Sequence, residues 1–235
     1  MSWAAATIIS PPPKLLIAEN NPAMLELLPH ALESNIPGIE MDVCWSRDVA
    51  VQKLPRSHYD ILVTNVALAG TANFSLLRQH FSLHPLMPVL VTARAKEHGI
   101  ARQALDRGAS DIIVAPLVPS EAVSAVQAAY KFWELRMAVA LREKRLEFLC
   151  EKQALQRGRQ LPTSFVNKTT MNLEEKFYSR KSTLQAYDRT IDALQRSLAI
   201  QTKQVTYLAG QIKQGAVRRL DVLLKMARHG GEMPQ

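Results

Sequence analysis

The chain contains 235 residues, a length that suits one or two domains. Apolar residues make up 47% and charged residues 21%, which excludes an intrinsically disordered chain and provides enough material for a core. The apolar runs are too short to cross a membrane, and the two cysteines, Cys44 and Cys150, are too few for a disulfide framework or a zinc site. We therefore expect a cytoplasmic protein that does not associate with membranes.

The net charge of +8 is distributed unevenly along the chain. Residues 1–130 contain 9 Lys/Arg and 11 Asp/Glu, whereas residues 131–235 contain 20 Lys/Arg and 10 Asp/Glu. The whole basic excess therefore belongs to the second half, which indicates that the two halves have different roles.

The first half alternates between short apolar runs and amphipathic segments, after an extended proline-rich tail at residues 1–13. The apolar runs predict strands at residues 14–18, 39–45, 59–64, 88–92 and 111–114, and the segments between and after them predict helices starting near residues 22, 47, 72, 96 and 120. Five such alternations predict an α/β domain at residues 14–130. Its fold would be a flavodoxin-like, doubly wound parallel sheet with strand order 2-1-3-4-5.

The second half is predicted to be helical. The helix that starts near Ser120 continues to about Gln156, which gives a helical extension at residues 131–157 and then a polar linker at residues 158–172. Residues 173–214 repeat apolar side chains every seven residues, and ten of the twelve seam positions are apolar or aromatic, which predicts a coiled coil. The principal seam residues are Phe177, Leu184, Ile191, Leu194, Leu198, Val205, Leu208 and Ile212. Gly215 is expected to interrupt this helix, leaving a short helix and a loose tail at residues 215–235.

The apolar seam of the coiled coil requires a partner, and two partners compete. Two chains can pair through it to form a homodimer, or it can fold back on the helix of residues 120–156 as a hairpin within one chain. That upstream helix carries a weaker seam of the same period, which includes Phe132, Leu135 and Val139. We expect a dimer in either case, because a lone two-helix hairpin leaves apolar surface exposed.

Four landmarks in the first half resemble the receiver domain of bacterial two-component signalling. They are the first strand with Glu19-Asn20, the third strand ending in Asn65, the fourth strand with Thr92-Ala93, and the run from Gly108 to Pro116. The resemblance implies a pocket at the carboxyl ends of the strands, in which an acidic pair holds Mg²⁺. An aspartate there accepts a phosphoryl group, and a Ser/Thr and a Lys bind its oxygens. It also implies a cis bond between Ala115 and Pro116.

Most of these chemical groups are missing from this chain. The acidic pair is Glu19-Asn20, Asn65 stands at the acceptor position, and Ala115 replaces the lysine, so that only Glu19 and Thr92 remain. Ile112 stands where the family has its aromatic switch residue. A neutral amide is not a competent nucleophile, and magnesium prefers anionic oxygen ligands. We therefore expect neither phosphorylation nor a cofactor or metal.

Other candidate sites are weaker. Asp60 lies at the far end of its strand, about 16 Å from the pocket. His80 and His84 are four residues apart, but the predicted helix ends near Phe81, so we expect a solvated pair rather than metal ligands. No serine, cysteine or glycine-rich motif of a known catalytic type is found.

The sequence thus favours a non-catalytic adaptor in a two-component-like pathway. It would bind an unidentified signalling protein through its degenerate receiver domain and dimerise through the coiled coil. The alternative is a regulator of transcription or RNA, related in design to antiterminators, that binds nucleic acid through the basic second half. Arg218 and Arg219 are the candidate contacts. Nucleic acid is the less favoured partner, because the charges are spread along the rod and residues 215–235 hold about one helix, where a helix-turn-helix needs two.

Overall fold

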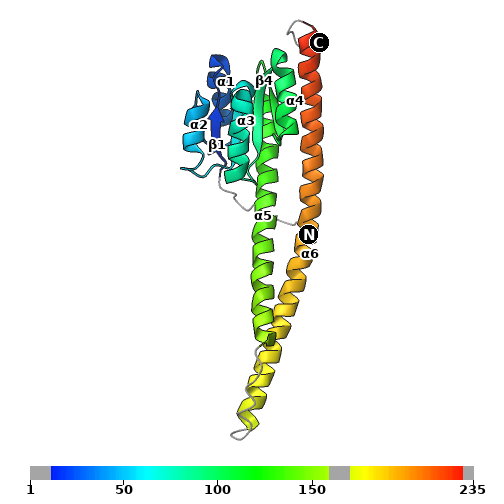
Figure 1. Ribbon diagram of the computed structural model, residues 1–235. Helices are drawn as coiled ribbons and strands as arrows, with labels where there is room; N and C mark the ends of the chain where they lie inside the picture. Colours follow the sequence, from blue (N-terminus) through cyan, green and yellow to red (C-terminus); the bar gives the residue numbers. More distant parts are fainter. Residues whose placement is uncertain (1–11, 159–169, 230–235) are drawn as a thin grey trace. The chain divides into compact units, whose positions relative to one another are not determined.

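The computed structural model describes residues 12–158 and 170–229 (Figure 1). The chain divides into two compact units. The first contains residues 1–134 together with residues 208–235, and the second contains residues 135–207.

A five-stranded parallel sheet forms the centre of the first unit. Its strands are β1 (Lys14–Ala18), β2 (Glu40–Cys44), β3 (Ile61–Asn65), β4 (Val89–Arg94) and β5 (Asp111–Ala115). Their order is β2-β1-β3-β4-β5, and every neighbouring pair is parallel, so the predicted flavodoxin-like fold is confirmed. β3 and β5 are buried at every residue, because helices cover both faces of the sheet.

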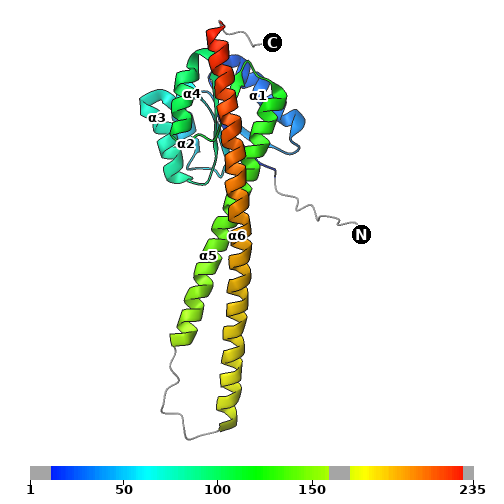
Figure 2. The ribbon, with the colours of Figure 1, turned by 90° about the vertical axis from the view of Figure 1, so that its right-hand side faces the viewer.

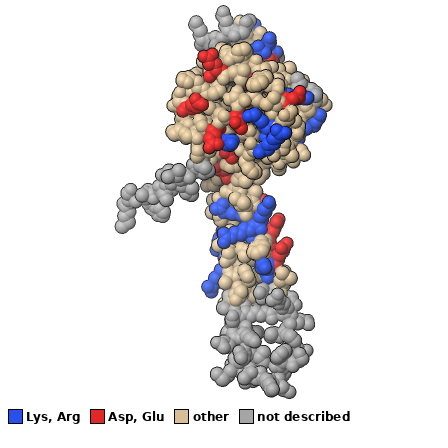
Figure 3. Space-filling view, turned by 90° about the vertical axis from the view of Figure 1, so that its left-hand side faces the viewer, with Lys and Arg blue, Asp and Glu red and all other residues tan. Residues whose placement is uncertain are grey.

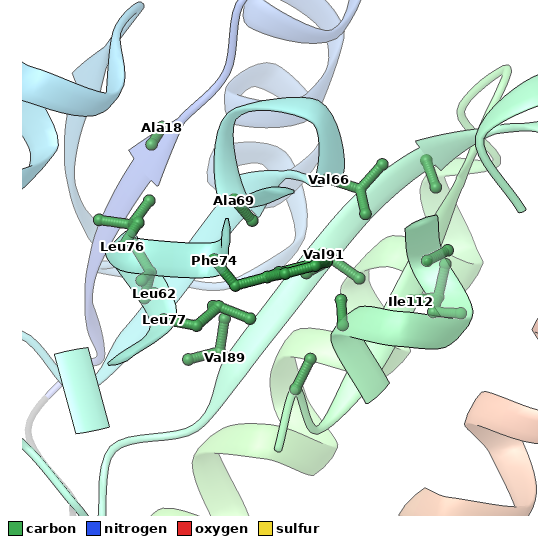
Figure 4. Close-up of a cluster of buried hydrophobic side chains, with 14 of the residues drawn as sticks. Ala18, Leu62, Val66, Ala69, Phe74, Leu76, Leu77, Val89, Val91 and Ile112 are labelled. Atoms are coloured by element: carbon green, nitrogen blue, oxygen red, sulfur yellow. The ribbon is translucent and has the colours of Figure 1, made fainter. Parts of the chain in front are cut away.

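Helices on the two faces produce two cores (Figure 2). On one face, α1 (Pro22–Asn35) and the start of α5 (Pro119–Gly158) pack on the strand residues that include Leu15 and Ile17. On the other face, α2 (Arg47–Lys53), α3 (Val66–Leu83) and α4 (His98–Asp106) pack on residues that include Leu16 and Leu62 (Figure 4). A short 3-10 helix, η1 (Ala95–Glu97), precedes α4. Successive strand residues thus face opposite cores, as the two-residue period of a strand requires.

α3 begins earlier than expected. The sequence predicts a loop to Gly70 and a helix from about residue 72, but α3 starts at Val66, directly after β3. The side chain of Asn65 caps this helix by accepting a hydrogen bond from the backbone N–H of Ala67 at 2.8 Å. Asn73 and Phe74 have positive φ angles of 53° and 58°, so the expected boundary coincides with a real irregularity of the backbone.

The predicted interruption at Gly215 is wrong. A single helix, α6 (Thr170–Arg228), continues through Gly215 without a break. A glycine inside a helix costs about 1 kcal/mol relative to alanine. Within the first unit, burial of Ala216, Leu223 and Met226 offsets that cost, and Leu223 and Met226 join the core on the α4 side of the sheet. Residues 215–228 are therefore a docked helix rather than a loose tail.

In the second unit, α5 and α6 run antiparallel to one another (Figures 1 and 2). The side-chain amide of Gln153 on α5 donates a hydrogen bond to Asp188 on α6. Ile191 is buried, while Leu194 and Leu198 are half-buried, within a single chain. In this unit the helices therefore pair within one chain, as in the hairpin alternative predicted from the sequence. The side chain of Phe177 lies outside the described residues.

None of the described helices is both long enough and apolar enough to cross a membrane.

Candidate functional site

Four predicted pocket residues meet at the carboxyl edge of the sheet. Glu19 follows β1, Asn65 ends β3, Thr92 lies in β4 and Ala115 ends β5. The carboxyl ends of parallel strands share one edge, which explains why residues so distant in sequence come together. All four are buried, whereas Asn20 is exposed.

The Glu19 carboxylate is the centre of a closed hydrogen-bond network. Its Oε1 accepts hydrogen bonds from the backbone N–H of Asn20 at 2.9 Å and of Asn21 at 2.8 Å. The side-chain Nδ2 of Asn65 donates to the same oxygen at 2.8 Å, and the hydroxyl of Thr92 donates to Oε2. A buried carboxylate requires such partners, and four neutral hydrogen-bond donors supply them here.

Both polar atoms of the Asn65 side-chain amide form hydrogen bonds. Nδ2 donates to Glu19, and Oδ1 accepts from Ala67 at the start of α3. An aspartate at this position has no Nδ2, so it would bring a second carboxylate to within hydrogen-bonding distance of Glu19. The asparagine thus converts a repulsive pair into a hydrogen-bonded one.

These residues do not fit a magnesium ion. The pocket has one carboxylate, both of whose oxygens already accept hydrogen bonds, and the second acidic position is the neutral, exposed Asn20. Ala115 offers no cation for a phosphoryl oxygen. Among the described residues, no group of three or more His, Cys, Asp or Glu side chains is placed to hold a metal.

Comparison with known proteins identifies the domain that contains this pocket. Residues 15–127 match the family model of the response regulator receiver domain. These residues are a receiver domain. A curated relative, the transcriptional activator protein ExaE of Pseudomonas putida, is 27% identical over 130 residues, which cover 54% of this chain and 61% of that protein. The chain thus spans less than two thirds of this relative.

Solved structures support the receiver fold. The signal receiver domain of an HD domain-containing protein from Pseudomonas fluorescens Pf-5 has a TM-score of 0.51 at 16% identity, over 57% of this chain and 98% of that one. NtrX from Brucella abortus, solved in complex with ADP, has a TM-score of 0.50 at 19% identity, over 63% of this chain and 34% of that one. Because both identities are low, the similarity shows the fold alone.

Pro116 and Ile112 lie at two further positions for which the resemblance sets an expectation. The Ala115–Pro116 bond is cis, as the resemblance implies. Ile112, at the position of the aromatic switch residue, is fully buried in the core beside α3 and α4 (Figure 4). The structure shows the Ile112 side chain in this buried position only.

The weaker candidate sites are structural. Asp60 precedes β3, at the end opposite the pocket, and accepts a hydrogen bond from the backbone N–H of Lys14 at 2.8 Å. The expectation of a solvated histidine pair is wrong for His80, because α3 extends to Leu83 and buries it. Its Nε2 donates to the Met87 carbonyl at 2.9 Å, and burial lowers the pKa of His80 to about 4.

The C-terminal segment of α6, residues 208–228, covers β5 of the receiver domain. It lies between α4, with Arg102 and Leu105, and α5, with Ser120 and Ser124 (Figure 2). Within this segment Leu223 and Met226 are almost completely buried. No local pattern in the sequence predicts this contact, because a heptad repeat shows that an apolar stripe needs a partner but does not identify the surface that it covers.

An ion pair fixes this segment to β5. Arg219 donates from Nε to Oδ1 of Asp111 at 2.9 Å and from Nη2 to Oδ2. Gly215, one turn earlier, makes room for the guanidinium, because a Cβ there would lie 3.0 Å from Nη2 of Arg219. Arg219 is therefore committed to a buried carboxylate and is a poor candidate for contacting nucleic acid, whereas Arg218 is exposed.

Proposed function

We propose that the chain is a non-catalytic, cytoplasmic signalling adaptor whose receiver domain binds a protein partner without being phosphorylated. The observation that carries this proposal is the closed network of Glu19, Asn65 and Thr92. In an active receiver domain, phosphorylation of the pocket changes the surface that a partner meets. Here the pocket is held in one state by its own side chains, so a partner would meet a constant surface.

The proposal predicts that small phosphodonors leave the receiver domain unmodified. Full-length protein treated with acetyl phosphate and Mg²⁺ is expected to keep its intact mass, because Asn65 is not a nucleophile and Ala115 and Asn20 supply no charge. The matched control is the triple variant Asn20→Asp, Asn65→Asp and Ala115→Lys, which restores the missing groups. Addition of one phosphoryl group to the wild-type protein would contradict the proposal.

We also propose that the adaptor is a homodimer formed through the coiled coil. Support comes from the incomplete burial of the seam within one chain. Of the seam residues with described side chains, only Ile191 and Ile212 are buried, whereas Leu184, Leu194, Leu198, Val205 and Leu208 keep part of their surface exposed. Apolar surface that a single hairpin leaves in water favours association with a second copy.

A second candidate function is regulation of transcription or RNA through the basic half, favoured by the similarity to the transcriptional activator protein ExaE. If the adaptor proposal holds, binding to duplex DNA or to structured RNA is weak and falls steeply with salt, and it is lost by about 200 mM. Fluorescence anisotropy at increasing salt measures this. A sequence-selective complex that persists at that salt would place the second function first.

A further inference from the structure

A cavity lies at the carboxyl edge of the sheet, near the hydrogen-bond network of Glu19. Its volume is about 550 Å³, within the range of about 300–1,000 Å³ that is typical of small-molecule sites. Residues from the start of α1, from the end of β4 with η1, from the end of β5 and from α6 line it, and all belong to the first unit. Doubly wound α/β domains bind their ligands in a crevice outside the carboxyl ends of the strands, which is where this cavity, here called the edge cavity, is found.

Apolar side chains form most of the wall of the edge cavity. Met24 on α1 and Met226 on α6 are buried and contribute to it from two sides of the chain. Leu27 is 49% exposed, and Leu117, after β5, is half-buried, so both keep apolar surface in contact with water. Ala115 ends β5 with a single methyl group, which leaves the space above the strand end open. A ligand with an apolar body would be stabilised by covering this surface.

Both charged side chains that line the edge cavity, in the part of the chain that the structure describes, are cations. They are Arg94, at the end of β4, and Lys96 in η1, and both are exposed. Arg94 forms an ion pair with the buried Glu97 at 2.7 Å, so Lys96 leaves this group of three with an excess of one positive charge. Asn21 caps the 14-residue helix α1 at the same cavity, and the N-terminus of a helix adds a partial positive charge.

The edge cavity differs in charge from other parts of the receiver domain. Figure 3 shows a face of the domain on which acidic and basic side chains are interspersed. The Glu19 carboxylate is fully buried among its four hydrogen-bond donors and does not line the cavity. The cavity therefore combines an apolar wall with positive charge, and it would attract a negatively charged group.

We propose that the edge cavity binds a small amphipathic anion, that is, an apolar organic body with one negatively charged group. The negative group would pair with Lys96 and with the exposed part of the Arg94 guanidinium. The apolar body would cover Leu27 and Leu117 and contact Met226. Inorganic phosphate fits the cavity less well, because it would leave the apolar surface of both leucines in water.

The test uses the full-length protein and two fluorescent probes that share one fluorophore. Dansyl glycine carries a carboxylate, whereas dansyl cadaverine carries an ammonium group. Fluorescence titration is expected to show saturable binding of dansyl glycine and at least about tenfold weaker binding of dansyl cadaverine, because Lys96 attracts the first and repels the second. The affinity for dansyl glycine should fall as salt rises.

Variants locate the bound probe. Lys96→Glu with Leu27→Glu is expected to weaken binding of dansyl glycine at least about tenfold, because a cation and an apolar contact are replaced by carboxylates. The matched control, Lys131→Glu with Leu83→Glu, makes the same exchanges at exposed positions that do not line the cavity, and it should bind as the wild type does. On α6, Ala227→Glu is expected to weaken binding more than Ala227→Gln, which adds a side chain of the same size without the charge. All these positions are exposed, so circular dichroism should show unchanged helix content.

Three results would overturn the proposal. The first is equal binding of both probes, because charge would then have no part in recognition. The second is wild-type affinity in Lys96→Glu with Leu27→Glu, or loss of binding in Leu141→Ala with Phe148→Ala on the hairpin, because the probe would then lie elsewhere. The third is displacement of dansyl glycine by millimolar inorganic phosphate, because the site would then take a simple anion and need no apolar body.

Discussion

Replacing Arg219 with alanine is expected to lower the free energy of unfolding of the receiver domain by about 3 kcal/mol. The Asp111 side chain is 2% exposed, and Arg219 is its cationic partner at 22% exposure. Removing one member of a buried pair costs about 3–5 kcal/mol because the other charge stays desolvated, and the partial exposure of Arg219 places the expected value at the lower end. Urea denaturation followed by circular dichroism measures the change.

Arg218 provides the matched control for this experiment. It is adjacent in sequence but exposed, and Arg218→Ala is expected to change stability by no more than about 0.5 kcal/mol. Adding Asp111→Asn to the Arg219 variant should recover part of the loss, because a neutral amide is less costly to bury than a carboxylate. If both arginine variants behave alike, residues 208–228 do not dock on β5 through this pair.

Replacing Ile191 and Leu198 with aspartate is expected to dissociate a homodimer of this chain. Burial of each apolar side chain contributes roughly 1.5–3 kcal/mol, and a dimer contains each site twice. The double variant would place four carboxylates in the seam of one dimer, at a cost that no pairing offsets. Light scattering should report a monomer, with the thermal transition of the receiver domain retained because neither Ile191 nor Leu198 belongs to its two cores.

The matched control places the same charges on the surface of the same helix. Gln195→Asp with Thr202→Asp keeps the seven-residue spacing at exposed positions and is expected to leave the molecular mass unchanged. If the wild-type protein is already a monomer at tens of micromolar, the dimer is excluded. The seam would then serve the hairpin within one chain.

The strand order and the loss of the phosphoryl-transfer groups could both be predicted from the amino-acid sequence. Both depend on local signals, namely short apolar runs between turn residues and the identity of single residues such as Asn65 and Ala115. Parallel crossovers then leave few topologies. The heptad repeat likewise showed that α6 carries an apolar stripe, because periodicity is a property of the sequence alone.

The contacts of these residues, in contrast, depend on how the chain folds. The sequence shows that Asn65 cannot accept a phosphoryl group, but the fold makes it a donor to Glu19 across 46 residues. It likewise brings Arg219 to Asp111 across 108 residues and carries α6 through Gly215, against the local signal for a break. Burial of Leu223 and Met226 stabilises that helix through contacts distant in sequence, which no local pattern encodes.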